Sequence, residues 1–382
     1  MATKCDSIEL LMNMNNNITW ITFNAFLDTD LYIVKELTRY YSIDWHIIRS
    51  ENDQFEYIDM LEEMKNIDGL KINLHICGRR LRKIECVPFY NRLISNIKKS
   101  KSELVFTSMA GAPYFIPILA MRMKKNNVIV AIHNVHVPKG GGSYWFFKLY
   151  NTITINSFMN FQTFSKSQYM DLKAIVPKKN VFYTPFILKD YGRAKNKRLV
   201  KEITFLNFGN IREYKRIDVL IEAAQRVYEI TEKSFRVIIA GKCEDWEKYK
   251  KLIKYDALFD IRLGRVENED VPDLFNEADY FVAPYQDIAQ SGSAVVAINY
   301  GKPIIASKLP AFEEYIIDKK TGYLIKPADV ESLVDVMKEI ILSNNDYYIE
   351  MVKQLKHYRD KQFSTNFIVE RYRENINNVI SK

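Results

Sequence analysis

The stretch ITFLNFGNIREYKRIDVLIEAA spans Ile203–Ala224 and sets the pattern for much of the chain. An apolar run ends at Gly209, a loop with Arg212 and Lys215 follows, and apolar residues then recur with helical spacing from about Ile217. Glycine lets a backbone turn tightly, and two cations beside a helix start favour a bound anion. The stretch predicts a strand–loop–helix unit with a diphosphate site, although solvated surface charges would give the same pattern.

A second stretch, YFVAPYQDIAQSGSAVVAINYGKPIIA, spans Tyr280–Ala306 and follows the same logic. A predicted strand runs into Pro284, a polar loop follows over 286–292, and a helix is expected from Ser293. The backbone N–H groups and hydroxyls of Gln290-Ser291-Gly292-Ser293 suit a sugar or a phosphate. An ordinary β–α–β crossover without a ligand is the alternative interpretation.

Short apolar runs alternate with helical stretches along most of the chain, which predicts an α/β protein with parallel sheets. The polar and basic segment 192–201 is interpreted as a linker between two Rossmann-like, doubly wound domains. We expect an N-terminal domain over 1–192, a C-terminal domain over 193–361, and a helix over 362–382 that crosses back to the first domain. Expected strands cover 18–23, 46–48, 74–76, 104–107, 128–133, 161–165, 203–208, 235–240, 261–263, 280–284 and 303–307. Such sheets bind ligands at the carboxyl ends of their strands, so two facing sheets predict a central cleft for two substrates.

The composition places the chain among globular proteins, since 47% of its 382 residues are hydrophobic and 27% are charged. No window approaches the roughly 18 uninterrupted apolar residues that span a bilayer, and the first 17 residues lack the apolar core of a signal peptide. A cytoplasmic location is therefore expected. The four scattered cysteines, Cys5, Cys77, Cys86 and Cys243, are expected to be reduced.

The formal charge of +8 is concentrated in the first half of the chain. From Lys71 to Lys148 there are 14 basic and 2 acidic residues. Such an excess predicts an anionic partner: a membrane surface, a phospholipid-linked acceptor or nucleic acid. Trp145 and Phe146 lie within this basic region and would suit a membrane interface. A solvated basic face and an ordinary core helix are the alternatives.

The segment Asp28-Thr29-Asp30 has the spacing of a DxD metal-binding motif. It follows the first expected strand without a second acidic cluster, and paired acids before a helix commonly serve as caps and dipole partners. We therefore expect no metal site.

Further residues match one family pattern when they are taken together with the two stretches above. They are Gly209, Lys215, Leu220-Ile221, Ala223-Ala224, Gly264-Arg265-Val266, Ala278-Asp279, Pro284, Gly301-Lys302-Pro303-Ile304-Ile305-Ala306 and Thr321-Gly322-Tyr323-Leu324. In this order they resemble the C-terminal domain of glycosyltransferase family 4, a retaining family of GT-B fold. The resemblance covers residues 203 to about 340, and the N-terminal half matches more loosely through Ala131-Ile132-His133-Asn134 and Phe164-Ser165-Lys166-Ser167.

Departures from the family pattern concern the donor site. Asn210 stands where the family has its first arginine, so we expect Arg212 to take that role. Ile288 and Val296 stand where the family has a pair of glutamates, the second of which usually contacts the nucleotide ribose. Asp287 and Gln290 are then the candidates to hold the sugar hydroxyls, as in the branch of the family with a Gln-Ser-Gly loop.

The resemblance implies a UDP-, GDP- or ADP-sugar donor, retention of configuration, no metal or other cofactor, and no nucleic-acid partner. It also implies a glycan acceptor, polyprenyl-linked or other, at an anionic membrane surface in polysaccharide or glycolipid synthesis. It assigns catalysis to His133, Arg212 and Lys215. It assigns donor binding to Gly209, Asn210, Arg212, Lys215, Gly241, Val266, Asp287, Gln290, Ser291, Gly292 and Ser293. A nucleotide-sugar epimerase of the same fold and a non-catalytic partner subunit stay open as alternatives.

Overall fold

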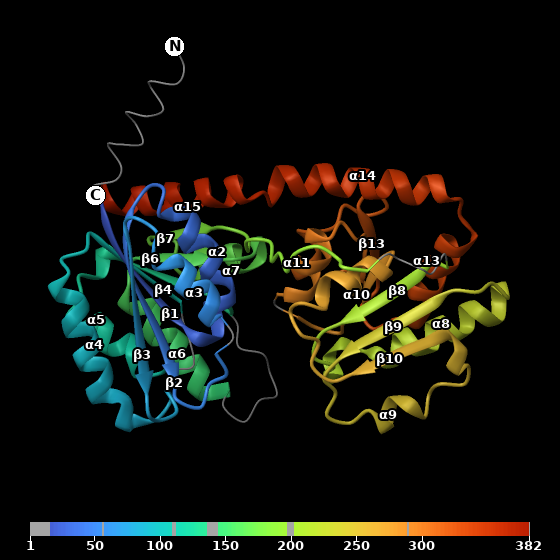
Figure 1. Ribbon diagram of the computed structural model, residues 1–382, viewed down its shortest axis with the longest axis horizontal. Helices are drawn as coiled ribbons and strands as arrows, with labels where there is room; N and C mark the ends of the chain where they lie inside the picture. Colours follow the sequence, from blue (N-terminus) through green and yellow to red (C-terminus); the bar gives the residue numbers. More distant parts are fainter. Residues whose placement is uncertain are drawn as a thin grey trace, which may run out of the picture. The chain divides into compact units, whose positions relative to one another are not determined.

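A computed structural model describes residues 16–55, 57–108, 112–135, 144–196, 202–288 and 290–381, with the backbone alone for 144–147. It divides into two compact units (Figure 1). Unit 1 comprises Met1–Ile187 together with Thr365–Lys382, and unit 2 comprises Leu188–Ser364. The first unit thus ends at Ile187, slightly before the expected boundary at 192. No helix within the described ranges has the length and apolar character needed to cross a membrane.

Unit 1 is built on a parallel sheet of seven strands among its described residues, in the order β3-β2-β1-β4-β5-β6-β7. The strands are β1 (Asn17–Phe23), β2 (Ser42–Ser50), β3 (Leu70–Cys77), β4 (Leu104–Ser108), β5 (Val128–Ile132), β6 (Asn160–Thr163) and β7 (Asn180–Tyr183). The helices are α2 (Leu27–Leu37), α3 (Ile58–Met64), α4 (Val87–Lys99), α5 (Phe115–Arg122), α6 (Tyr144–Ser157), α7 (Lys166–Ile175) and α15 (Thr365–Ile380). This is the doubly wound arrangement that alternating strands and helices predicted.

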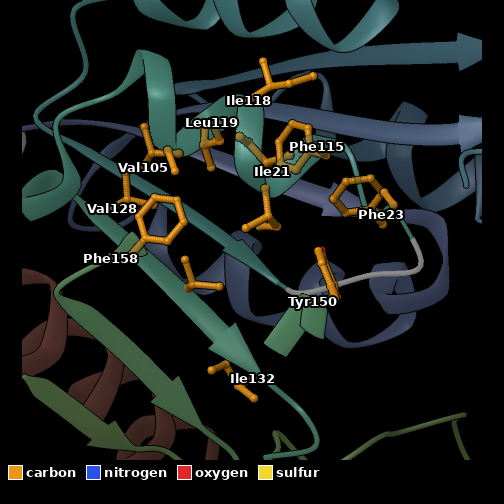
Figure 2. Packing of buried hydrophobic residues seen from close by; sticks show 14 of the residues in the cluster. Ile21, Phe23, Val105, Phe115, Ile118, Leu119, Val128, Ile132, Tyr150 and Phe158 are labelled. Carbon is orange, nitrogen blue, oxygen red and sulfur yellow. The ribbon is translucent and has the colours of Figure 1, made fainter. Parts of the chain in front are cut away.

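Helices cover both faces of this sheet, and each face has its own apolar core. On one face, α4, α5, α6 and α7 pack on the strands. Phe115 and Leu119 of α5 contribute to this core together with Val105 and Val128 of the strands (Figure 2). On the other face, α2, α3 and α15 form the second core. Strands buried on both faces explain why the sequence shows continuous apolar runs rather than alternation.

Helix α15 belongs to unit 1 although it ends the chain. Its apolar stripe, which includes Ile368, Tyr372 and Ile376, is buried against the sheet. The amide of Asn375 donates to Gln162 Oε1 at 3.1 Å and to Thr184 Oγ1 at 2.8 Å. These buried polar contacts fix the position of the helix along the sheet, because an unpaired buried amide would be costly.

Unit 2 contains a parallel sheet with the order β10-β9-β8-β11-β12-β13, six strands among the described residues. Its strands are β8 (Thr204–Phe208), β9 (Arg236–Gly241), β10 (Phe259–Leu263), β11 (Tyr280–Ala283), β12 (Ile304–Ser307) and β13 (Gly322–Ile325). Its helices are α8 (Ile217–Thr231), α9 (Glu247–Lys250), α10 (Val271–Glu277), α11 (Gly292–Asn299), α12 (Pro310–Glu313), α13 (Val330–Leu342) and α14 (Asn345–Gln362). Short 3-10 turns complete the two units: η1 (Asn24–Phe26), η2 (Ile84–Cys86), η3 (Lys125–Asn127), η4 (Glu213–Lys215) and η5 (Asp256–Leu258).

The structure adds elements that the sequence pattern did not reveal. Strands β7 and β13 were not expected, because each has only four residues and no long apolar run. The tail over 347–381, whose pattern predicts an amphipathic helix, forms two helices, since Phe363 leaves the helical conformation and packs against Tyr315 and Tyr358. Cys77 and Cys86 are free, with their Sγ atoms 3.3 Å apart, and Cys243 is free; Cys5 lies outside the described residues.

Asp30, the second acid of the Asp28-Thr29-Asp30 segment, lies in the first turn of α2 and is buried in the core. Its Oδ2 accepts a 2.6 Å hydrogen bond from Thr22, whose Oγ1 in turn accepts from Trp45 Nε1 at 2.8 Å. Burial raises the pKa of Asp30 to about 7, while the hydrogen bond from Thr22 partly opposes that shift. The carboxyl group of Asp30 is therefore part of a buried hydrogen-bond network with Thr22 and Trp45.

This burial predicts a pH dependence of stability. Asp30 is protonated in the folded protein up to about pH 7 but ionises near pH 4 when unfolded, so its contribution to stability is lost as pH rises through that window. Asp30→Asn should flatten the decline in unfolding free energy between about pH 4 and pH 7, the interval between the unfolded and folded pKa values, as measured by urea denaturation. Asp28→Asn is the matched control, and an unchanged slope in Asp30→Asn would contradict the assignment.

Candidate active site

The candidate site of unit 2 lies at the carboxyl ends of β8 and β11. Strand β8 pairs with β9 on one side and with β11 on the other, so the winding direction reverses between β8 and β11. Ligands of open α/β sheets bind at such a switch point. The two loops that leave these strands, 209–216 and 284–291, contain most of the residues that the sequence assigned to the donor.

Two glycines bring the ends of β8 and β9 into close contact. Gly209 has φ of +103° and Gly241 has φ of +147°, conformations that side chains rarely tolerate. A Cβ added to Gly241 would lie 2.2 Å from the carbonyl oxygen of Gly209. The N–H of Gly209 donates to Ala240 O at 2.9 Å, which completes the junction. Gly241 therefore acts by permitting the backbone position of Gly209.

Lys215 is a buried cation beside Gly209. Its side chain is 5% exposed, and a Cβ on Gly209 would lie 3.2 Å from its Nζ and 2.8 Å from Ser293 Oγ. Within the described part of the chain, its ammonium group has neither a hydrogen-bond nor an ion-pair partner; its Nζ lies 5.5 Å from the ring centroid of Tyr285. Burial lowers the pKa of Lys215 to about 8, so it is still mostly charged at neutral pH. A desolvated cation without a counterion is suited to an anionic ligand.

The N-terminus of α11 adds polar groups to the same place. Ser291 caps the helix by accepting a hydrogen bond from the N–H of Ala294, and Ser293 lies in the first turn. The N–H groups of this turn carry partial positive charge. The Nε2 of Gln290 is buried without a hydrogen-bond partner among the described residues. Gly209, Lys215 and Ser293 are thus brought together, with Ser291 and Gln290 next along the chain.

The two loops are held together by contacts that the sequence did not reveal. The N–H of Gln286 donates to Tyr214 O at 2.8 Å, and the rings of Tyr214 and Tyr285 meet edge-on with centroids 5.9 Å apart. Tyr285 is fully buried and packs on Phe312, so it supports Lys215 from within the domain. The one signal for Tyr285 was its place directly after Pro284, where the strand ends.

The other predicted donor-binding residues lie at the same carboxyl edge of the sheet but are less buried than Lys215. Arg212 is half-exposed and forms a 2.5 Å ion pair with Glu244, a residue that sequence reasoning missed although it follows the end of β9 closely. Asn210, Asp287 and Gly292 are exposed, and Val266 is half-buried after β10. Of the positions that carry glutamates in the family pattern, Ile288 is half-buried and Val296 is buried, so neither offers an acceptor for a ribose hydroxyl.

His133 lies in unit 1, directly after β5. Its ring is stacked between Phe26, with centroids 4.0 Å apart, and Phe164, with centroids 4.6 Å apart. Burial lowers the pKa of His133 to about 3, so the imidazole is neutral at physiological pH. Its Nε2 is buried without a hydrogen-bond partner within the described ranges. The group is suited to hydrogen bonding with a ligand hydroxyl, and too weak a base to carry a positive charge there.

Comparisons with known proteins show which family the C-terminal unit resembles. The family model for glycosyl transferases group 1 matches residues 189–362, nearly all of unit 2. An uncharacterised 41.2 kDa protein in the cps region of Klebsiella pneumoniae is 24% identical over 174 residues, 45% of each chain. An uncharacterised glycosyltransferase of Methanocaldococcus jannaschii is 26% identical over 139 residues, 36% of each chain. These matches span less than half the length of the curated relatives.

Solved structures resemble the chain over nearly its whole length. A glycosyltransferase from Rickettsia africae superposes with a TM-score of 0.71 at 14% identity, covering 96% of this chain and 99% of that one. Sucrose-phosphate synthase from Thermosynechococcus elongatus gives 0.72 at 15% identity, covering 96% and 100%. Anabaena HepE in complex with UDP and glucose gives 0.69 at 12% identity, covering 95% and 100%. The expected GT-B fold is therefore confirmed.

The glycine junction predicts a specific loss of stability. Gly241→Ala should lower the free energy of unfolding by roughly 2–4 kcal/mol, because strained backbone and overpacking each cost about 1–3 kcal/mol. Gly264→Ala is the matched control: its φ is +119°, but nothing lies within 4 Å of an added Cβ, so only backbone strain applies. Equal losses in the two variants, measured by denaturant unfolding, would show that the contact with Gly209 is unimportant.

Proposed function

Since residues 189–362 match the family model of glycosyl transferases group 1 and the chain has the GT-B fold, we propose that this protein is a metal-independent retaining hexosyltransferase. It transfers a sugar from a nucleoside-diphosphate donor to an acceptor hydroxyl. The observation that supports this most is the buried ammonium group of Lys215 beside Gly209, Ser293 and the start of α11. That set of groups matches the charge and hydrogen-bonding needs of a diphosphate.

In the proposed reaction, the bond between the anomeric carbon and the β-phosphate oxygen breaks, and negative charge grows on that phosphate. Lys215 and the N–H groups of α11 stabilise this charge where it develops. The acceptor oxygen forms its bond to the anomeric carbon on the same face, and its proton passes to the departing phosphate. Arg212 contributes once it exchanges Glu244 for phosphate. Neutral His133 binds a hydroxyl of the donor sugar through Nε2.

The donor is proposed to be a UDP-sugar, with GDP- and ADP-sugars as the other candidates. UDP is the first choice because structures of similar fold, HepE among them, contain it. The acceptor is proposed to be anionic, such as a polyprenyl-diphosphate-linked glycan in surface polysaccharide or glycolipid synthesis. The basic half of the chain and the relative in a cps region support this choice.

Turnover assays with purified protein test the activity. Slow hydrolysis of one donor, or transfer to added lipid-linked acceptors, should occur and survive EDTA. Interconversion of two nucleotide sugars without acceptor would instead identify an epimerase. Absence of hydrolysis, transfer and donor-induced thermal stabilisation across the three donor classes would identify a non-catalytic partner.

Lys215 is expected to dominate turnover. Lys215→Ala should reduce kcat by roughly 100- to 1000-fold, the usual effect of removing one charge-stabilising group. Lys338→Ala, an exposed lysine of α13, is the control and should leave kcat unchanged. Activity within about threefold of wild type in Lys215→Ala would remove Lys215 from the site.

The same lysine sets a pH limit. Because the pKa of Lys215 is lowered to about 8, its charged form is lost as pH rises through 8, and kcat/KM should fall there. In Lys215→Arg any residual activity should persist to higher pH, since guanidinium stays charged. An identical decline in both proteins would mean that another group titrates.

We also propose that unit 1 docks reversibly on anionic membranes. The ends of α4 and α5 carry six exposed cations, Lys98, Lys99, Lys101, Arg122, Lys124 and Lys125, none of which forms an ion pair with a described residue. The Asn127 side chain donates to Glu103 O at 2.9 Å, so the segments that follow the two helices lie side by side. Met121 beside them is 77% exposed. The side chains of Trp145 and Phe146 lie outside the described part of the structure.

Vesicle sedimentation tests this surface. Each lysine near an anionic leaflet adds about 1 kcal/mol of attraction, so the protein should bind anionic but not neutral vesicles and dissociate at about 1 M salt. Changing Lys98, Lys99, Lys124 and Lys125 to Ser should abolish binding. The same change at Lys320, Lys326, Lys338 and Lys356 of unit 2 removes equal charge and should not. Equal loss of vesicle binding in both variants would show that the binding depends on net charge alone.

A further inference from the structure

Strand β3 forms one edge of the sheet in unit 1, with β2 as its neighbour (Figure 1). The N–H of Ile43 donates to Gly69 O at 2.7 Å and that of Glu51 to Cys77 O at 2.9 Å. In a parallel ladder these two bonds place the N–H and C=O groups of the odd-numbered residues toward β2. The groups of Leu70, Ile72, Leu74 and Ile76 therefore point outward, where no described strand pairs with them. An eight-residue free edge is long for a natural sheet.

The side chains on this edge lack the usual protection against pairing. Leu74 is 45% exposed and Ile76 is 52% exposed, and both lie on the same face of the strand because their numbers differ by two. Natural edge strands commonly carry a charge, a proline or a bulge at such positions. Here the one charged side chain of the strand is Lys71, near its beginning. The outer half of β3 thus has the chemistry of a strand that pairs with another.

The segments on either side of β3 carry opposite charge. The residues before it contain four exposed acids, Asp59, Glu62, Glu63 and Asp68, with a single lysine, Lys65. The residues after it contain four exposed cations, Arg79, Arg80, Arg82 and Lys83, with a single acid, Glu85. A strand that runs from an acidic end to a basic end is complementary to its own antiparallel copy, since each end then meets the opposite charge.

We propose that β3 pairs antiparallel with β3 of a second copy of this chain, about a two-fold axis at Leu74. In this register Leu74 lies opposite Leu74 of the other copy, and Ile72 lies opposite Ile76, so both exposed apolar side chains gain apolar neighbours. All outward backbone groups of these residues find partners, as an isologous two-fold interface requires. Continued past the strand ends, the register sets Asp68 level with Arg80 of the other copy. This inference does not depend on the proposed enzymatic function.

The other face of the strand accepts this pairing without burying a charge. There Asn73 lies opposite His75 of the second copy. His75 Nε2 lies 2.9 Å from His46 Nδ1, and burial keeps the pKa of His75 near 4, so the ring is neutral at physiological pH. Asp44 Oδ2 lies 3.2 Å from His46 Nε2, and Asp44 Oδ1 accepts from Asn73 at 2.7 Å, so the carboxylate already has polar neighbours within the unit. Lys71 near the strand start is exposed and stays hydrated.

The oligomeric state is the first test. Sedimentation velocity over a range of concentrations should show the 45.0 kDa chain associating to twice its mass. Leu74→Lys sets two like charges against each other on the axis and should return the protein to monomer, while Leu342→Lys, at an exposed leucine of unit 2, should not. The proposal would be overturned by a protein that stays monomeric at every concentration. A dimer that tolerates Leu74→Lys would overturn it as well.

Disulfide trapping tests the register itself. With a mild disulfide oxidant, Leu74→Cys should cross-link to itself, because residues directly opposite have Cβ atoms about 5 Å apart. Ile72→Cys alone should not, since two copies of residue 72 would be four residues or about 14 Å apart along the strands. A mixture of Ile72→Cys and Ile76→Cys should cross-link, and unaltered protein is the blank for native cysteines. Cross-linking of Ile72→Cys alone, as readily as Leu74→Cys, would overturn the register.

A charge swap tests the complementary ends. Asp68→Arg and Arg80→Asp should each weaken dimerisation by roughly three- to tenfold, as expected for exposed pairs that occur twice in the interface. The double variant Asp68→Arg/Arg80→Asp restores opposite charges in both contacts and should regain most of the affinity. Additive weakening in the double variant would show that these residues do not face each other.

Discussion

The candidate site depends on the burial of one charge, the ammonium group of Lys215. Its position follows from backbone geometry: Gly241 allows β9 to approach β8, and Gly209 lets the chain leave β8 without a side chain in the way. Tyr285 and Ser293 from the next loop complete its surroundings. A buried charge without a counterion destabilises the unliganded site, and it is tolerated where a ligand supplies that counterion. The same desolvation strengthens the binding of an anion.

Burial also sets the protonation of groups in unit 1. Burial raises the pKa of Asp30 to about 7 in the core, and His133 is held neutral between aromatic rings. The residue types alone do not predict these protonation states, because aspartate is normally charged and histidine partly charged near the pH of the cell. In both cases desolvation is the first cause, and it changes what the residue does: one becomes part of a core network, the other a neutral hydrogen-bonding group.

The basic excess of the first half divides into two surfaces in the structure. One lies at the ends of α4 and α5, and the other follows the free edge strand β3. The first has cations that form no ion pair with a described residue, beside an exposed methionine, which is the chemistry of a membrane surface. The second has an acidic counterpart in the segment that precedes β3. A single count of charge along the sequence merges these two surfaces, although they suit different partners.

The sequence by itself determined the α/β fold class, most strands and the two loops at the switch point. Apolar periodicity and the glycines at 209 and 241 are local signals, because each depends on residues close together in the chain and can be recognised from the sequence. Short strands such as β7 and β13, the break at Phe363, and the support of Lys215 by Tyr285 depended on tertiary contacts. Only the tertiary structure decided that Lys215 is buried, that Arg212 is paired with Glu244 and that β3 has one neighbour among the described strands. Burial and pairing arise between residues far apart in the chain, and no local pattern encodes them.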